Sequence, residues 1–465
     1  MLIIPKNNGS ISYVTLENTI IFDKGYLEMV KVVKFGGSSL ADAEQFKKVA
    51  EIIKSEDSRR YVVASAPGKR YDDDIKVTDM LYSCYKLVKE NKDIDEAFKL
   101  IEDRYNGIIK DLGLDFWLQP EFDRIKNAIV HHAGRDYIAS RGEYLNSMIL
   151  AKYLGYDFVD AEEGIFFTEN GVLDTEKTNE ELTKILKEHT HAVVPGFYGV
   201  MPNGTIKTFS RGGSDITGSI VARAIGADIY ENWTDVSGML MADPRCVKNP
   251  KVINTITYAE LRELAYMGAT VMHEDAIFPV REKGIPINIR NTNKPEDAGT
   301  MIVSKVDSNK VDTVITGIAG KKGFSVISIE KSMMNAEIGF GRKVLEALEN
   351  HKICFEHLPS GIDTMSVVVN DNDFLPVKET LIADIQRKTK ADNISVYNGI
   401  ALVAVVGRGM AGVKGTAGRV FGAIGNAGIN IRMIDQGSSE LNIIVGVAED
   451  DYVKTLEAIY NEFVK

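Results

Sequence analysis

The sequence has few cysteines and no long hydrophobic run. These two features limit the classes of protein to which it can belong. Cys84, Cys246 and Cys354 are its three cysteines, and they lie far apart without metal-site or redox spacing. That predicts reduced, structural thiols in a cytoplasmic protein. No apolar run approaches the roughly 20 residues that a transmembrane helix needs, so no membrane association is expected.

Basic residues are fewer than acidic residues, with 55 Lys and Arg against 66 Asp and Glu. The formal net charge is −11, which argues against a nucleic-acid partner or an anionic membrane surface. A local basic pocket for a phosphate remains compatible with this balance. The 44% hydrophobic and 26% charged residues are typical of a globular protein, and 465 residues predict two or three domains.

The first 28 residues are treated separately, because they lack the basic start and small-residue cleavage site of a signal peptide. A strand begins soon after Met29, as it would at a natural amino terminus. We therefore expect residues 1–28 to be a peripheral extension. The alternative is an added edge strand from "TIIFD".

Short apolar runs and amphipathic stretches alternate from residue 29 to about residue 305. This pattern predicts an α/β domain with an open, mostly parallel sheet and helices on both faces. The polar segment "SNKVD" near residue 310 predicts a domain boundary.

Beyond that boundary the pattern repeats with a period of about 70 residues. Residues 324–398 read as a βαββαβ unit, and 399–465 repeat the order without the last strand. The spare strand at 312–320, within the linker 306–323, is expected to supply the missing strand, next to the strands at 400–406 and 441–448. Residues 324–398 would then be an inserted unit.

The stretch "VVKFGGSSLAD", residues 32–42, reads as a buried strand, a glycine turn and a helix. Free N–H groups and a positive dipole at a helix start favour an anion, and glycines let the backbone approach it, so a phosphate is expected here. The lysine precedes the glycines, so this is neither of the common nucleotide-binding glycine motifs. A plain tight turn is the alternative.

Glycine- or hydroxyl-rich junctions recur after four apolar strands of this domain: "KFGGSS" (34–39), "ASAPGKR" (64–70), "FSRGGSDITG" (209–218) and "TDVSGMLMADPR" (234–245). Four such turns predict a ligand cleft along the carboxyl edge of one sheet. The third places Arg211, Ser214 and Asp215 around two glycines, which suits a small molecule with carboxylates and an ammonium.

These junctions, with "SRGE" at 140–143 and the two βαββαβ units, resemble the aspartokinases of the amino-acid kinase family with paired ACT domains. The resemblance runs from Met29 to the carboxyl terminus and is closest to the monofunctional enzymes of clostridia and bacilli. It implies transfer of the γ-phosphoryl group of ATP, carried with Mg²⁺, to the β-carboxylate of aspartate.

The resemblance also implies residue roles. The catalytic residues would be Lys34, which bridges the phosphates, and Asp215, which orients Lys34. The aspartate-binding residues would be Ser65, Thr78, Glu143, Arg211 and Ser214. The nucleotide-binding residues would be Lys34, Gly36, Gly37, Ser38, Thr234, Asp235 and Arg245.

Each of these assignments has a structural alternative. Arg211 and Asp215 could form an ion pair across their turn, Glu143 could lie in the first turn of a helix, and Thr78 could be a helix N-cap. His273 is expected to be a packing residue and is left out of the site. Two positions depart from the family pattern, Leu240 for a tyrosine and Thr270 for a lysine, so the way adenine is held stays open.

Regulation is expected in the first repeat unit. The loop at 332–340 precedes a helix start that would attract a carboxylate, and Asp363 could meet an ammonium. The effector-binding residues would be Met333, Asn335, Ile338, Gly339, Phe340, Ser360 and Asp363. By resemblance the effector is lysine, with threonine as the alternative, and paired units predict a homodimer or tetramer. A dimerisation platform without effector binding is the other reading.

Two rival functions compete with an aspartate kinase. One is a kinase of the same fold that acts on glutamate, acetylglutamate or a nucleoside monophosphate, although those lack "SRGE" with this ACT pair. The other is a catalytically silent amino-acid sensor, which would have no need of a phosphate-bridging Lys34.

Overall fold

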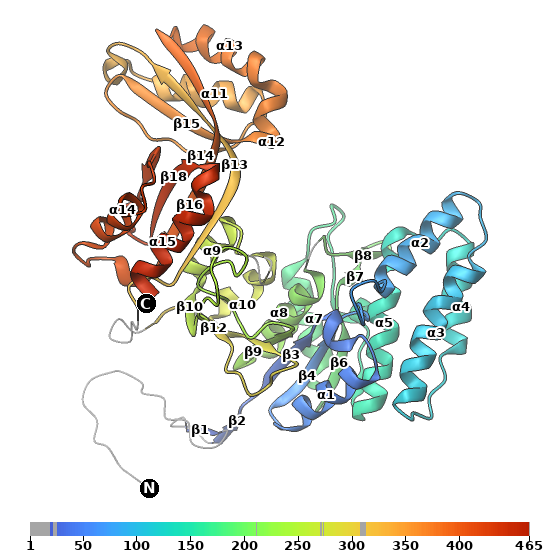
Figure 1. Cartoon of the computed structure of the whole chain (residues 1–465). Coiled ribbons are helices and arrows are strands. Elements are labelled where there is room, and N and C mark those ends of the chain that lie inside the picture. The colour runs from blue at the N-terminus through green and yellow to red at the C-terminus, as the bar shows by residue number, and fades with distance from the viewer. Residues whose placement is uncertain are drawn as a thin grey trace, which may run out of the picture. The chain divides into compact units, whose positions relative to one another are not determined.

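The computed structural model describes residues 19–21, 26–210, 212–269, 272, 274–306 and 313–464. The chain divides into two compact units (Figure 1). The first comprises Met1–Ser237 and Met272–Ser304, and the second comprises Gly238–Val271 and Lys305–Lys465. The expected catalytic domain, 29–305, contributes residues to both compact units, because Gly238–Val271 belongs to the second.

A mostly parallel sheet forms the centre of the first unit. Its order is β12-β11-β9-β3-β4-β6-β5, and only the β11–β12 pair is antiparallel. The strands are β3 (Lys31–Phe35), β4 (Arg59–Ala64), β5 (Asp157–Phe158), β6 (Ala192–Pro195), β9 (Ile229–Thr234), β11 (Ile287–Asn291) and β12 (Thr300–Val303). Because β3 and β4 are almost wholly buried, helices must flank the sheet.

Helices flank this sheet, as the alternating pattern predicts. Helix α5 contacts β4, β5 and β6, and α8 contacts β3, β4 and β9. The helices are α1 (Ala43–Lys54), α2 (Val77–Lys89), α3 (Asp95–Asp111), α4 (Gln119–Val130), α5 (Arg135–Leu154), α6 (Ala161–Gly164), α7 (Thr175–Lys187), α8 (Gly213–Ile225) and α10 (Phe278–Lys283). A hairpin of β7 (Tyr198–Val200) and β8 (Ile206–Thr208) completes the unit.

Part of the amino-terminal extension is described. β1 (Thr19–Ile21) pairs with β2 (Tyr26–Glu28) in a separate two-stranded antiparallel sheet. The alternative in which "TIIFD" adds an edge strand to the large sheet is therefore wrong for Thr19–Ile21. Residues 1–18 and 22–25 lie outside the described residues.

One antiparallel sheet runs through the second unit, in the order β14-β15-β13-β16-β18-β17. The strands are β13 (Gly317–Glu330), β14 (Phe355–His357), β15 (Thr364–Asn370), β16 (Asn393–Val406), β17 (Met433–Asp435) and β18 (Asn442–Ala448). The helices are α9 (Tyr258–Tyr266), α11 (Phe340–Asn350), α12 (Asp371–Phe374), α13 (Lys378–Thr389), α14 (Thr416–Asn426) and α15 (Tyr452–Val464), and β10 (Thr255–Thr257) precedes α9. Such a sheet with helices fits two ACT-like halves.

Two long strands differ from the short strands that the sequence predicts. β13 joins the expected strands "DTVITGIAG" and "GFSVISIE", and β16 joins "ISVYNG" and "IALVAVVG". Gly323 and Gly399, which lie where the expected strands meet, both have a positive φ, near the register shifts of the β13–β16 pair. A bulge lets a strand continue with an altered twist, so each strand serves both halves of the sheet.

The pairing expected for residues 312–320 is found for part of that range. Gly317–Gly320 pair with Val403–Val406. β18 is hydrogen-bonded to the other side of β16, so it is not the immediate neighbour of β13. Residue 312 and the predicted boundary at "SNKVD" lie outside the described residues.

Helix α9 is held to the second unit by a buried carboxylate. Glu260 is 0% exposed, and its oxygens accept hydrogen bonds from the Thr316 hydroxyl and from the Arg408 backbone and guanidinium groups. Glu260 also closes a capping box with Thr257 at the start of α9. These bonds explain why Gly238–Val271 folds with β13 and β16 although it precedes β11 in the chain.

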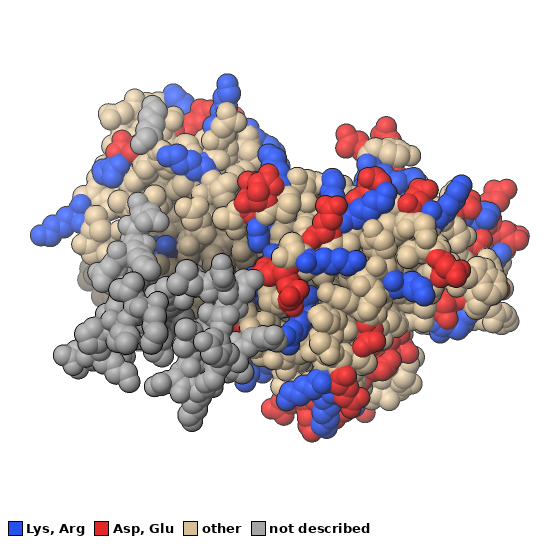
Figure 2. All heavy atoms as spheres, turned by 90° about the horizontal axis from the view of Figure 1, so that it is seen from below, with Lys and Arg blue, Asp and Glu red and all other residues tan. Residues whose placement is uncertain are grey.

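The surface carries charges of both signs. On the face in Figure 2, Lys and Arg side chains are interspersed with Asp and Glu side chains over the described residues. Within the described ranges, no helix is both long and apolar enough to cross a membrane.

Candidate functional site

Two glycine turns meet at the carboxyl ends of β3 and β4. The Gly68 N–H donates to the Gly37 carbonyl at 2.8 Å, and the Ser65 N–H donates to the Phe35 carbonyl at 3.2 Å. A Cβ atom on Gly68 would lie 2.6 Å from the Gly37 carbonyl carbon, so only glycine fits there. The first two junctions of the sequence therefore form one continuous backbone surface at the sheet edge.

A lysine, a carboxylate and an amide lie together beside these turns. Lys34 Nζ lies 2.6 Å from Asp215 Oδ1, and both side chains are mostly buried. Asn232 Nδ2 donates to the same Asp215 oxygen at 2.9 Å, and Lys34 Nζ approaches Asn232 Oδ1 at 3.5 Å. The pairing of β3 with β9 sets Lys34 opposite Asn232. The expected closeness of Lys34 and Asp215 is observed.

The sequence reading missed Asn232. It is 5% exposed on β9, within the run "IYENW", where Glu231 is the other buried polar residue. A buried amide in a central strand needs partners. That requirement was the signal that could have identified it.

From "VVKFGGSSLAD" we expected the glycine turn to lead directly into an α-helix. The structure differs from this expectation. Gly37–Leu40 form a short 3₁₀ helix, and α1 begins later, at Ala43. The Asp42 side chain caps α1 by accepting the Gln45 N–H. Because α1 already has an anionic cap, any phosphate contacts here would come from the start of the 3₁₀ helix, at Gly37 and Ser38, rather than from the α1 start. The Gly36 N–H already donates to the Trp233 carbonyl at 3.1 Å.

Glu143 is a buried carboxyl with an unmet hydrogen bond. It lies in the third turn of α5 and is 6% exposed, so the alternative that placed it in a first helical turn is wrong. Burial raises the pKa of Glu143 to about 8, although the Ala66 N–H donates to it and Arg141 is near. Among the described residues, nothing donates to Glu143 Oε2. A buried carboxyl with a free oxygen is suited to a cationic ligand group.

The remaining expected aspartate-binding residues lie on neighbouring elements. Ser65 follows β4, and its carbonyl accepts from Asn146 of α5 at 2.7 Å. Thr78 is the second residue of α2, whose N-cap is Lys76, so the N-cap alternative for Thr78 is wrong. Ser214 lies in the first turn of α8 against Gly196, where an added Cβ would lie 2.6 Å from its hydroxyl oxygen. Arg211, and with it the proposed Arg211–Asp215 pair, lies outside the described residues.

The expected nucleotide residues fall in both units. Thr234 ends β9, and its hydroxyl lies 3.2 Å from the Asp235 carboxylate. Arg245 belongs to the second unit, where it pairs with Asp243 at 2.6 Å and is 86% exposed. His273 and Thr270 lie outside the described residues.

The expected effector loop is tied to the strand beside it. The Met333 N–H donates to Asp363 Oδ1 at 2.9 Å, and the Asn335 N–H donates to the Ile362 carbonyl at 3.1 Å. Asp363 thus binds a backbone N–H of the loop. Gly339 is the N-cap of α11 with a φ of 83°, and no side chain of this residue caps the helix start. The Phe340 N–H donates to the Glu337 carbonyl at 3.2 Å.

The other members of the expected effector set differ in exposure. Ile338 is fully exposed, and Ser360 is also exposed, whereas Phe340 is 4% exposed. Phe340 belongs to the hydrophobic core between α11, α13 and the sheet.

Comparisons with known proteins agree with this architecture. The model of the amino acid kinase family matches residues 29–291, and that of the ACT domain matches residues 403–463. Aspartokinase 3 of Bacillus subtilis (strain 168) is 39% identical over 452 residues, which cover 93% of this chain and 98% of that protein.

Solved structures show the same fold. Clostridium acetobutylicum aspartate kinase is 52% identical, with a TM-score of 0.85 over 94% of this chain and 100% of that one. Escherichia coli aspartokinase III, in complex with aspartate and ADP, is 23% identical with a TM-score of 0.70 over 93% and 99%. The same enzyme with lysine and aspartate is 24% identical, with a TM-score of 0.69 over 94% and 100%. At these identities the Escherichia coli structures support the fold alone.

Proposed function

The chain belongs to the aspartokinases of the amino acid kinase family, which phosphorylate aspartate, and from this premise we propose its detailed reaction and its control. The reaction is transfer of the γ-phosphoryl group of ATP to the β-carboxylate of L-aspartate, which gives 4-phospho-L-aspartate. This is the first step towards lysine, threonine and methionine. The observation that carries the proposal is the Lys34–Asp215 pair beside the two glycine turns.

The acceptor needs no general base. The reference pKa of an aspartate side chain is ~3.9, so the nucleophile is already ionised at neutral pH. Catalysis then consists of aligning two anions and neutralising the charge between them. Lys34 would bridge the phosphates, and Mg²⁺ carried by the nucleotide would add to this neutralisation.

Asp215 and Asn232 would keep the Lys34 ammonium in place. Asp215 forms an ion pair with the ammonium, and the Asn232 side-chain oxygen lies 3.5 Å from it. Asn232 also donates a hydrogen bond to Asp215. A lysine has many rotamers, and fixing one of them before the substrate arrives lowers the cost of ordering it in the transition state.

The proposed aspartate site uses the buried carboxyl of Glu143. Its free Oε2 would accept the substrate ammonium, and Arg211 would hold a substrate carboxylate. Ser65, Thr78 and Ser214 would complete the site. Binding of the ammonium would favour the ionised form of Glu143, so a proton would be released below about pH 8.

We assign the nucleotide to Gly36, Gly37, Ser38, Thr234, Asp235 and Arg245. Arg245 would exchange Asp243 for a phosphate, and this exchange costs little because Arg245 is solvent-exposed and the ion pair is therefore weak. A cytoplasmic location fits a reaction that consumes ATP.

Control would come from the carboxyl-terminal repeat. We propose ACT units at 324–398 and 399–465, the catalytic domain at 29–305 and a linker with the spare strand at 306–323. Lysine is the proposed inhibitor, by the resemblance of the sequence to aspartokinases; Escherichia coli aspartokinase III, which shares the fold, has itself been solved with lysine and aspartate. Threonine is the alternative, and pairing of these units in a homodimer or tetramer is expected.

A coupled ADP-release assay with aspartate, glutamate and acetylglutamate tests the proposal. We expect turnover with aspartate only. Turnover with another acceptor instead would indicate a different member of the fold. No turnover with any acceptor would favour the silent sensor.

A further inference from the structure

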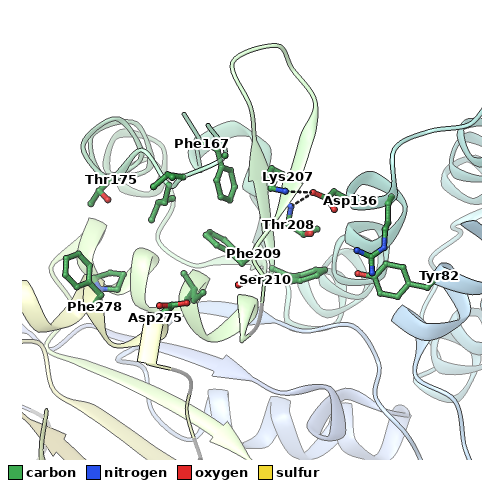
Figure 3. A pocket seen from close by; sticks show the side chains of 17 residues that line it. Tyr82, Asp136, Phe167, Thr175, Lys207, Thr208, Phe209, Ser210, Asp275 and Phe278 are labelled. Carbon is green, nitrogen blue, oxygen red and sulfur yellow. Dashed lines mark hydrogen bonds and ion pairs between the residues drawn. The ribbon is translucent and has the colours of Figure 1, made fainter. Parts of the chain in front are cut away.

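A cavity of about 620 Å³ lies in the first unit. Among the described residues, none of those expected to bind aspartate or the nucleotide lines it. Figure 3 shows a polar end at Tyr82 and Asp136, with Phe209 between that end and Phe278. A cavity of this size and mixed lining is typical of a small-molecule site.

The polar end offers a cation and an anion side by side. Arg135 and Asp136 are the first two residues of α5 and both line the cavity. The Arg135 guanidinium lies over the Tyr82 ring, 4.4 Å from its centroid, and among the described residues it forms no ion pair. Asp136 uses Oδ2 for its contacts with Lys207 Nζ at 3.2 Å and the Thr208 N–H at 3.3 Å, so Oδ1 can accept a further donor.

The start of α5 adds a second attraction for a carboxylate. Its N-cap, Gly134, gives no side-chain hydrogen bond, and the helix continues for 20 residues. The first-turn N–H groups and the positive end of the dipole therefore act together with the Arg135 guanidinium. An anionic ligand group is favoured at this end of the cavity.

Aromatic rings line the middle of the cavity, and at its far end Phe278 lies beside Asp275 and Thr175 (Figure 3). The rings of Phe167 and Phe209 have centroids 5.0 Å apart and are tilted by 50°. Phe197, Phe278 and Pro279 also line the cavity, and Phe278 is 58% exposed. Such a surface gains from burial of an apolar or aromatic group and offers little to a second carboxylate.

We propose that this cavity binds a free α-amino acid with a large apolar side chain. Its carboxylate would pair with Arg135, its ammonium with Asp136, and its side chain would lie between the phenylalanine rings. Aspartate fits poorly, because its second carboxylate would enter the aromatic part. A nucleotide also fits poorly, since Asp136 and Asp275 would face its phosphates. The site is therefore distinct in chemistry from both substrates of the kinase.

A ligand in this cavity would contact residues that neighbour the proposed catalytic and aspartate-binding residues in the chain. Ile216 lines the cavity and directly follows Asp215 on α8, and Ser210 lines it shortly before Ser214. A ligand that packs on Ile216 therefore lies one residue away from the Lys34–Asp215 pair. The proposal itself concerns binding, which can be measured whether or not the chain is an active kinase.

Isothermal titration of the full-length protein with L-phenylalanine tests the proposal. We expect saturable binding, with weaker binding of three analogues that each lack one recognised group. These are phenethylamine without the carboxylate, 3-phenylpropionate without the ammonium, and L-alanine without the apolar body. Equal affinity for phenylalanine and phenethylamine would overturn the role of Arg135, and absence of saturation at millimolar phenylalanine would overturn the site.

Two variants separate this site from any other amino-acid site in the chain. Arg135→Gln should weaken phenylalanine binding about tenfold, because a charged hydrogen bond is lost. Phe278→Ser should also weaken it, and as the side chain is exposed the fold should survive. Arg124→Gln is the matched control, an exposed arginine paired with Glu121 outside the cavity. Unchanged affinity in both Arg135→Gln and Phe278→Ser would place the binding elsewhere and refute the proposal.

Discussion

Replacing Glu143 by glutamine should remove a pH dependence of stability that the wild-type protein carries. Burial raises the pKa of this carboxyl from its ordinary value of 4.5 to about 8. The folded state therefore binds one proton more than the unfolded state between these two values. Unfolding free energy then falls as the pH rises through this window. Glutamine has the shape of the protonated acid and cannot ionise, so the variant should lack this slope.

The magnitude follows from the two pKa values. Within the window, each pH unit changes the folding equilibrium by up to a factor of ten, and the effect levels off near the folded-state pKa. Between about pH 6 and about pH 8, the wild type should lose about 2 kcal/mol relative to Glu143→Gln. At about pH 8 the variant should be the more stable protein, although it has lost an ionisable group of the proposed site.

Tryptophan fluorescence gives a direct measurement. The two tryptophans, Trp117 and Trp233, both lie in the first unit, as Glu143 does, so denaturant curves report on the relevant unit. Glu51→Gln is the control, because Glu51 is an exposed carboxylate on α1. Parallel pH profiles for the wild type and Glu143→Gln would refute the reasoning, as would a wild-type protein that gains stability across the window.

Three further predictions concern catalysis, control and folding. Lys34→Ala should lower kcat by about two to three orders of magnitude in the ADP-release assay, as loss of an oriented charge does; retention of more than a tenth of wild-type turnover would contradict its role. Asp363→Ala frees the Met333 N–H and should relieve inhibition by millimolar lysine without lowering uninhibited activity, whereas inhibition equal to that of the wild type would argue against effector binding there. Glu260→Ala leaves Arg408 without its buried partner and should destabilise the second unit by about 3–5 kcal/mol in calorimetry, and an unchanged transition would show that the pair contributes little.

Local patterns predicted most of the fold, because they depend on short segments. The apolar runs of β3 and β4 and the helical spacing of α1 need only their own residues and a buried face. The errors arose where a local signal has two outcomes. Gly323 and Gly399 lie where the sequence predicts that one strand ends and the next begins, yet in the structure both have a positive φ near a register shift within the long strands β13 and β16.

The candidate site was predicted where its residues lie in distinctive motifs. Lys34 and Asp215 were expected to lie together, and they do. Asn232 was missed because its importance comes from strand pairing: β9 sets it opposite Lys34, and nothing within "IYENW" reveals that neighbour. Glu143 was assigned to the site, but its burial could not be read from the sequence, since it depends on how α5 packs beside the turn that contains Ala66.

The sequence did not reveal that the Gly238–Val271 segment belongs to the second compact unit. The reason is relevant to the proposed feedback inhibition. The segment follows β9 directly, so chain order assigns it to the catalytic domain. Glu260 nevertheless accepts hydrogen bonds from Thr316, 56 residues later, and from Arg408, 148 residues later, at the ends of the two long strands. If an effector alters the pairing of β13 and β16, the change can pass through Glu260 into α9 and the segment that carries Arg245. A buried carboxylate with several donors transmits such a change well, because leaving any of its bonds unmade is costly.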